Sequence, residues 1–66
     1  MKNLIKVERA RHNMSQEDLA QTVGVSRQTI YSIETGKYVP STVLALKIAL
    51  HFKVKVEELF ILEDDD

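Results

Sequence analysis

The amino-acid sequence predicts a compact all-α domain of five short helices. Three observations lead to this prediction. Apolar residues recur at helical spacing along most of the chain. Ser15, Ser26 and Ser41 each stand directly before such a stretch, where a serine caps the free N–H groups of a helix. Gly24 and Gly36 stand directly after two of the stretches, where glycine supplies the left-handed conformation that ends a helix.

The length of the chain limits what it can build. Sixty-six residues make one domain, and so short a chain is marginally stable without a metal, a disulfide or a partner. There is no cysteine, and His12 and His51 are far apart in the sequence, so we expect neither a disulfide nor a metal site. Dimerisation is then the expected source of stability for a domain over residues 1–62, which an acidic tail at 63–66 follows.

The first two helices are predicted over Leu4–His12 and after Ser15. Asn3 is a possible N-cap of the first helix, and Glu8 interrupts its apolar pattern. In the second helix, Asp18 stands three residues after Ser15, close to a capping box. The expected core residues of this region are Ile5, Val7, Met14, Leu19, Ala20 and Val23.

The third helix is predicted between Ser26 and Gly36, the fourth after Ser41, and the fifth over Val56–Phe60. The fourth helix is apolar on most sides, so it must lie at the centre of the core or at an interface. Residues Ile61–Leu62 follow the fifth helix and could extend as a strand or cover a partner.

Residues 16–35 have the pattern of a helix-turn-helix. Ala20 is small enough to let two helices cross closely, and Gly24 lies four residues later, where the turn needs a glycine. The apolar residues that would fix the angle between the helices are Leu19, Val23, Val25, Ile30 and Ile33. The outer face of the third predicted helix, which is the second helix of this motif, is polar, which suits the base edges in the major groove of DNA. It consists of Arg27, Gln28, Thr29, Tyr31 and Ser32.

Charge supports a nucleic-acid partner only weakly. The formal net charge of −1 includes four consecutive acids, Glu63–Asp66, and without them nine basic residues face six acidic ones, a net charge of +3. No apolar run is long enough for a membrane span and the charged start is unlike a signal peptide, so a cytoplasmic location is expected. There is no nucleophile–base arrangement or glycine-rich phosphate loop, so neither an enzyme nor a cofactor is expected.

The chain resembles the phage repressor and Cro type of helix-turn-helix domain, the Xre-like family of small prokaryotic regulators. The likeness extends from Ile5 to Phe60. The segments that carry it are SQEDLA (15–20), VGVSRQTI (23–30), IETGKYVPS (33–41), LALKIA (44–49) and VEELF (56–60). The resemblance implies four or five helices and a dimer that places one recognition helix in each of two successive major grooves of an operator.

Position by position, the resemblance also implies DNA contacts. Gln16 corresponds to a phosphate contact at the N-terminus of its helix. Arg27, Gln28 and Ser32 correspond to residues that read base edges, where arginine suits guanine and glutamine suits adenine. The other expected DNA-contacting residues are Ser26, Thr29, Tyr31, Lys37, Tyr38 and Ser41, the last three on the phosphate backbone.

The resemblance further implies a partly buried ion pair between Arg9 and Glu34, which we interpret as structural. Three positions depart from the family pattern. Glu8 stands where the family often has an apolar residue. Lys53 stands where a glycine usually ends the fourth helix, and Lys55 where a small N-cap residue usually begins the fifth. We therefore expect the turn at Lys53 to be either strained or differently built, and weak capping at Lys55.

We thus expect a sequence-specific DNA-binding regulator of transcription, a repressor, that acts as a homodimer with the helix after Ser26 in the major groove. No membrane or small-molecule partner is expected. The alternative is a protein-interaction module on the same fold, such as an antitoxin-like protein or an anti-repressor partner. Excess apolar residues near the C-terminus predict a dimer interface of Val56, Leu59, Phe60, Ile61 and Leu62.

Overall fold

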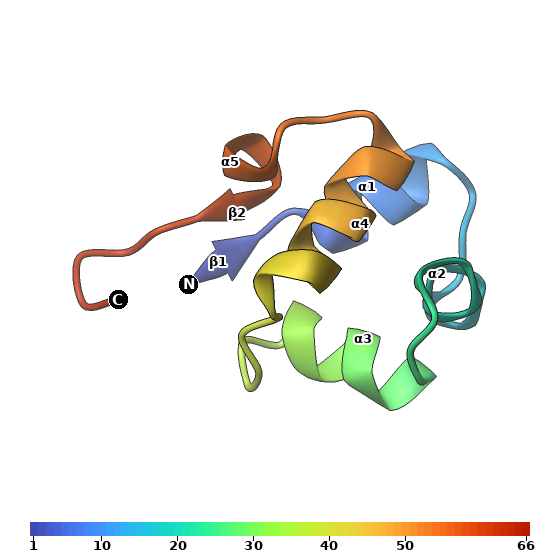
Figure 1. Cartoon of the computed structure of the whole chain (residues 1–66), viewed down its shortest axis with the longest axis horizontal. Helices are drawn as coiled ribbons and strands as arrows, with labels where there is room; N and C mark the ends of the chain where they lie inside the picture. Colours follow the sequence, from blue (N-terminus) through green and yellow to red (C-terminus); the bar gives the residue numbers. More distant parts are fainter.

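Five helices and two very short strands make up the fold. The computed structural model describes residues 1–66 and has the elements in the order β1 (Lys2–Asn3), α1 (Ile5–Arg11), α2 (Gln16–Val23), α3 (Arg27–Glu34), α4 (Thr42–Phe52), α5 (Val56–Leu59) and β2 (Phe60–Ile61). The ribbon of α4 crosses the middle of the view and α3 lies along the lower edge (Figure 1). The prediction of five helices is confirmed, and α2 and α3 fall within the expected helix-turn-helix. None of the helices is both long and apolar enough to cross a membrane.

The two strands join the ends of the chain. Lys2 pairs with Ile61 and Asn3 with Phe60 in an antiparallel ladder, so both chain ends lie on one side of the molecule (Figure 1). The expected extended segment after the fifth helix is confirmed, although it begins at Phe60 and shortens α5 by one residue. The strand β1, which pairs with this segment, was not predicted, because a strand of two residues is too short to show an alternation of apolar and polar side chains.

Asn3 is not the N-cap of α1. The N-cap is Leu4, and its side chain makes no capping hydrogen bond. From β1, the Oδ1 atom of Asn3 accepts a hydrogen bond from the Ile5 N–H over 3.2 Å. Its Nδ2 atom donates to the carbonyl oxygen of Ile33 over 2.9 Å. Asn3 therefore joins the start of α1 to the last turn of α3, a contact that no local sequence signal predicts.

The core is apolar and draws on all five helices. Val7 was expected in it, but this side chain is 45% exposed on the outer face of α1. Glu8 is buried in its place and pairs with Arg11, with Nη1 and Oε1 3.2 Å apart. Met14 packs partly buried against the core, which consists of Ile5, Leu19, Ala20, Val23, Ile30, Ile33, Leu44, Ile48, Ala49, Phe52 and Leu59.

The helix caps follow the predicted serines. Ser15, Ser26 and Ser41 each accept a hydrogen bond through Oγ from the backbone N–H three residues on, over 3.0, 3.2 and 3.1 Å. In α2 the capping box is complete, because the Ser15 N–H donates to Asp18 Oδ2 over 3.0 Å. Gly24 ends α2 at φ +79°, as expected.

The capping box makes the stability of α2 depend on pH. Hydrogen bonds from the Ser15 backbone and hydroxyl hold the pKa of Asp18 below its usual 3.8. A lowered pKa means that the carboxylate stabilises the folded state above pH 3.8, and that this contribution is lost as the pH falls through the folded-state pKa. We expect Asp18→Asn to lower the urea midpoint at pH 7, and we expect this difference to shrink as the pH falls below 3.8. Glu17→Gln is the control in the same turn, and an Asp18 effect independent of pH would contradict the prediction.

The predicted strain at Lys53 is present. Lys53 ends α4 in the left-handed conformation, at φ +57° and ψ +41°. Lys55, the N-cap of α5, makes no side-chain cap, and only the reverse bond from its N–H to Glu58 Oε1 is formed, over 3.0 Å. Both departures from the family pattern therefore weaken the same connection between α4 and α5.

Replacing Lys53 with glycine is expected to stabilise the protein. A left-handed conformation costs a residue with a Cβ about 1–2 kcal/mol, while glycine costs roughly 0.5–1 kcal/mol in added unfolded-state entropy. The net gain is on the order of 0.5–1 kcal/mol, which corresponds to a rise of a few degrees in the thermal midpoint. Lys53→Ala keeps the Cβ and should give no such rise. Equal midpoints for the two variants would contradict this account.

Candidate nucleic-acid interface

The packing of α2 against α3 decides which face of α3 points outward. Leu19 and Ala20 of α2 and Ile30 and Ile33 of α3 are buried in the common core. The N–H groups of Gly24 and Val25 both donate to the carbonyl oxygen of Ala20, over 2.9 and 3.0 Å, and so close the turn between the helices. Since the apolar side of α3 faces inward, its polar side is presented to solvent.

The polar face of α3 carries the residues that were expected to read bases. Arg27, Gln28 and Tyr31 are exposed, and Thr29 and Ser32 are half-buried beside them. Arg27 forms none of the ion pairs of the structure, which join Met1 to Glu63 and Asp66, Arg9 to Glu34, and Arg11 to Glu8. Its guanidinium group is therefore free to pair with a ligand.

Lys37 and Tyr38 flank this face from the loop after α3. Gly36, at φ +79°, reverses the chain, and the N–H groups of Lys37 and Tyr38 both donate to the carbonyl oxygen of Ser32, over 2.9 and 3.2 Å. The ammonium group of Lys37 lies 5.8 Å from the centre of the Tyr31 ring. The loop is thus fastened to the outer face of α3 instead of projecting freely.

Together, α3 and the loop enclose an open hollow of about 270 Å³. One basic and four neutral polar or aromatic side chains line it, without a carboxylate. This composition favours an anionic or polar ligand group, such as a phosphate or a sugar of a nucleic-acid backbone. The lining residues are Gln28, Thr29, Ser32, Lys37 and Tyr38.

Three of the expected DNA-contacting hydroxyl groups are already engaged within the protein. Ser26 and Ser41 cap α3 and α4, and the hydroxyl groups of Ser26 and Thr29 lie 3.0 Å apart. These side chains therefore stabilise the N-terminal ends of α3 and α4, next to Arg27 and to the loop between the two helices. Whether they also contact DNA stays a prediction.

Gln16 belongs to a polar network that links three helices. Arg9 of α1 donates to both carboxylate oxygens of Glu34 at the end of α3, from Nε over 2.7 Å and from Nη2 over 3.1 Å. Gln16, the first residue of α2, donates from Nε2 to Glu34 Oε1 over 3.2 Å. Glu34 of the predicted ion pair therefore also accepts a hydrogen bond from Gln16. This bond holds the side chain of Gln16, the expected phosphate contact, in place.

The expected dimer residues do not all reach the surface. Leu59 is only 1% exposed and belongs to the core of its own chain, so it is unavailable to a partner. Val56 and Phe60 are half-buried, and Ile61 and Leu62 are exposed. Sequence reasoning missed Leu46, which is 53% exposed and lines an apolar groove together with Val56, Phe60 and Leu62. A second apolar stripe on the fourth helix, Val43, Leu46 and Leu50, was the signal that could have revealed it.

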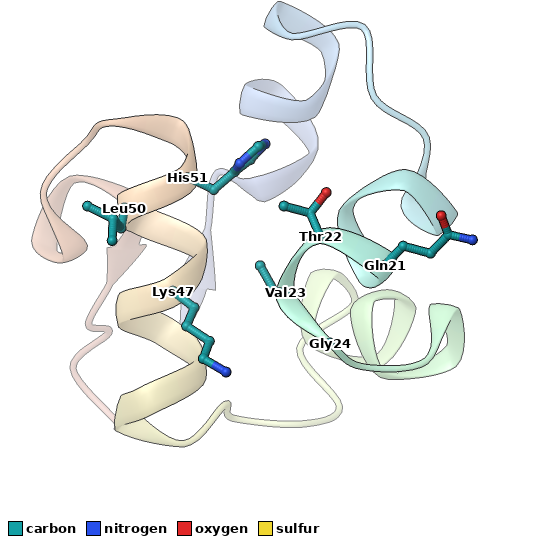
Figure 2. A pocket seen from close by; sticks show the side chains of 7 residues that line it. All are labelled: Gln21, Thr22, Val23, Gly24, Lys47, Leu50 and His51. Carbon is teal, nitrogen blue, oxygen red and sulfur yellow. The ribbon is translucent and has the colours of Figure 1, made fainter.

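A second hollow, of about 450 Å³, opens between α2 and α4 (Figure 2). The side chains around it come from Gln21 to Gly24 on one side and from α4 on the other, where Lys47 points along its own helix (Figure 2). None of these side chains is a carboxylate.

Comparison with known proteins places the chain in a family. A family model described as helix-turn-helix matches residues 5–59. A helix-turn-helix-type transcriptional regulator of Methanocaldococcus jannaschii is 62% identical, and the regulator YgzD of Bacillus subtilis is 54% identical, each over 66 residues that cover both chains completely. The chain belongs to the helix-turn-helix family of transcriptional regulators. The predicted family and the absence of enzymatic function are thereby confirmed.

A solved structure supports the same assignment at the level of the fold. The restriction-modification controller protein C.AhdI from Aeromonas hydrophila superposes with a TM-score of 0.76 at 32% sequence identity, over 85% of each chain. Members of this helix-turn-helix family bind DNA.

Proposed function

We propose that the protein is a sequence-specific repressor that binds operator DNA as a homodimer, with α3 in the major groove. One observation carries the base-reading role. Arg27 and Gln28, the first two residues of α3, are exposed on a rigidly capped helix end, and Arg27 has no internal partner. Recognition helices of this type contact base edges through residues near their N-terminus. A protein bound over a promoter blocks transcription by occupancy alone, which is why repression is the proposed sign.

Phosphate contacts on both sides of α3 complete the proposed interface. At one side is the start of α2, where Gln16 lies beside the unpaired N–H groups of the first helical turn. At the other side are Lys37 and Tyr38, which line the hollow next to Gln28. These flanking groups bracket the reading residues, so they would set the register of α3 in the groove.

The homodimer is supported by an apolar groove on a different side of the domain. Its volume is about 350 Å³, and seven of the ten residues that line it are hydrophobic. Val39 and Leu62 at its rim are exposed, and α4 adds exposed Val43 and Leu50 near Leu46. So much exposed apolar surface is unusual for a free monomer of this size. The lining is Met1, Val39, Pro40, Thr42, Ala45, Leu46, Val56, Glu57, Phe60 and Leu62.

The dimensions of the domain fit this arrangement. The principal extents are 31, 22 and 20 Å. Binding to successive major grooves would require the two α3 helices of a dimer to lie roughly 34 Å apart, a separation of the same order as the longest extent of one domain.

Selection of random DNA duplexes by the full-length protein tests the proposal. We expect the enriched sequences to contain an inverted repeat whose half-sites are about one helical turn apart. Transcription in vitro from a promoter that carries this repeat should fall when the protein is added. Enrichment of no sequence would refute direct reading by α3 and favour the alternative, a module whose groove binds another protein.

The dimer is tested separately by sedimentation equilibrium. We expect wild-type protein to be dimeric at micromolar concentration and Leu46→Lys to be monomeric, because the charge would enter the apolar groove. Val7→Lys changes an apolar residue of similar exposure on α1 and should remain dimeric. A monomeric wild-type protein, or equal behaviour of the two variants, would refute this interface.

A further inference from the structure

Three side chains with metal-binding atoms meet where the ends of α1 and α4 lie together. His12 is the C-cap of α1, Met14 follows two residues later, and His51 lies in the last turn of α4. His51 Nε2 lies 3.1 Å from Met14 Sδ, and the ring centres of His12 and His51 are 6.4 Å apart. The expectation of no metal site assumed that the two histidines were distant, but the fold makes them neighbours.

Contacts within the protein orient both rings. The Nδ1 atom of His12 lies 2.9 Å from the carbonyl oxygen of Glu8, which can only accept. Nδ1 of His12 therefore carries the proton and Nε2 keeps a free lone pair, the arrangement that a backbone carbonyl imposes on metal-binding histidines. Phe52 packs against both rings, with ring centres 5.1 and 5.3 Å away. The His51 ring points from α4 toward α1 (Figure 2).

The donor atoms decide which ion suits the site. No three residues among His, Cys, Asp and Glu are grouped for a metal, so the carboxylate and thiolate ligands of common zinc or calcium sites are missing. The thioether is a soft donor, which selects monovalent copper, and imidazole is a borderline donor that also binds copper. With metal–nitrogen bonds of about 2.0 Å, two imidazoles on opposite sides of one ion have ring centres roughly 6 Å apart, close to the separation found.

We propose that His12, Met14 and His51 form a binding site for monovalent copper. In the metal-free chain the contact of His51 with Met14 is an Nε2–H···S hydrogen bond. On binding, the ion takes the place of that hydrogen, and the ring proton of His51 moves to Nδ1. The bound ion links His51 of α4 to Met14, which lies between α1 and α2, two residues before Gln16.

Anaerobic titration of the full chain with Cu⁺, in competition with a chromophoric Cu⁺ chelator, tests the site. We expect one ion per chain, and at least a tenfold weaker affinity for His51→Gln and for Met14→Leu. Thr22→Ala, a change in the adjacent hollow, is the matched control and should bind as the wild type does. Circular dichroism checks that each variant is folded, and leucine keeps the volume of Met14.

A measurement without substitution accompanies the titration. Diamagnetic Ag⁺, a stand-in for Cu⁺, should shift the NMR signals of the Met14 methyl group and of both histidine rings together. Copper bound equally by the wild type and by the His51→Gln/Met14→Leu double variant would place the ion elsewhere and overturn the proposal. Absence of binding, or signals that do not move together, would overturn it as well and leave the cluster as packing alone.

Discussion

Replacing Arg27 with alanine is expected to lower affinity for the selected operator roughly ten- to a hundredfold without changing the fold. The side chain is exposed at the start of α3 and makes no ion pair within the chain, so its loss removes no internal contact. A bidentate arginine–guanine contact accounts for about 1–3 kcal/mol of discrimination against the wrong base. Affinity for the operator should therefore fall toward the affinity for random DNA.

Two comparisons separate base reading from simple charge attraction. Lys47→Ala removes a cation of the same sign from α4, outside the α3 face, and should change operator affinity little. Lys37→Ala should weaken binding to operator and to random DNA alike. The slope of log affinity against log salt concentration should fall by about one, the loss expected for one phosphate contact. Fluorescence anisotropy at several salt concentrations measures all three variants. Equal losses on operator and random DNA for Arg27→Ala would show that Arg27 contacts only the backbone.

The helix-turn-helix could be predicted from the sequence because its signals are local. Serine caps and the glycine turn at Gly24 act within three or four residues of their own position, and each was found where expected. The inward positions of Ile30 and Ile33 follow from helical spacing alone. The face of α3 that points outward is then fixed, which is why the candidate base-reading residues could be named in advance.

Features that depend on distant parts of the chain could not be predicted in this way. The strand pairing of Lys2 with Ile61 and the approach of His12 to His51 join segments that are 59 and 39 residues apart. Leu59 was assigned to the dimer interface because it belongs to an excess of apolar residues near the C-terminus. The structure shows instead that α5 places its side chain in the core of its own chain. Composition shows that a residue is apolar, but only the packing of helices shows whether its own chain covers it.

The Arg9–Glu34 pair lies between these two cases. Nothing local predicts it, and only the resemblance to known repressors suggested it. The structure adds that Glu34 also accepts from Gln16, so a single carboxylate joins α1, the start of α2 and the end of α3. The geometry of the proposed DNA-binding face therefore depends on a residue that need not touch DNA.

Breaking this pair should have the largest effect on stability. The side chains of Arg9 and Glu34 are only 14% and 7% exposed, so Arg9→Ala leaves a carboxylate in the interior without its charge partner. The expected loss is about 3–5 kcal/mol. Small domains have total unfolding free energies of about 5–15 kcal/mol, so the variant should approach the limit of folding at room temperature. Urea denaturation followed by circular dichroism measures the loss.

A double variant distinguishes loss of attraction from burial of an unpaired charge. Arg9→Met with Glu34→Leu removes both charges and keeps apolar volume, so it should recover much of the stability that either single change loses. It also removes the acceptor for Gln16 Nε2. If Glu34 positions Gln16 for a phosphate, the double variant should be folded yet bind DNA more weakly. A double variant as unstable as Arg9→Ala would instead mean that the pair stabilises the fold by more than its burial costs.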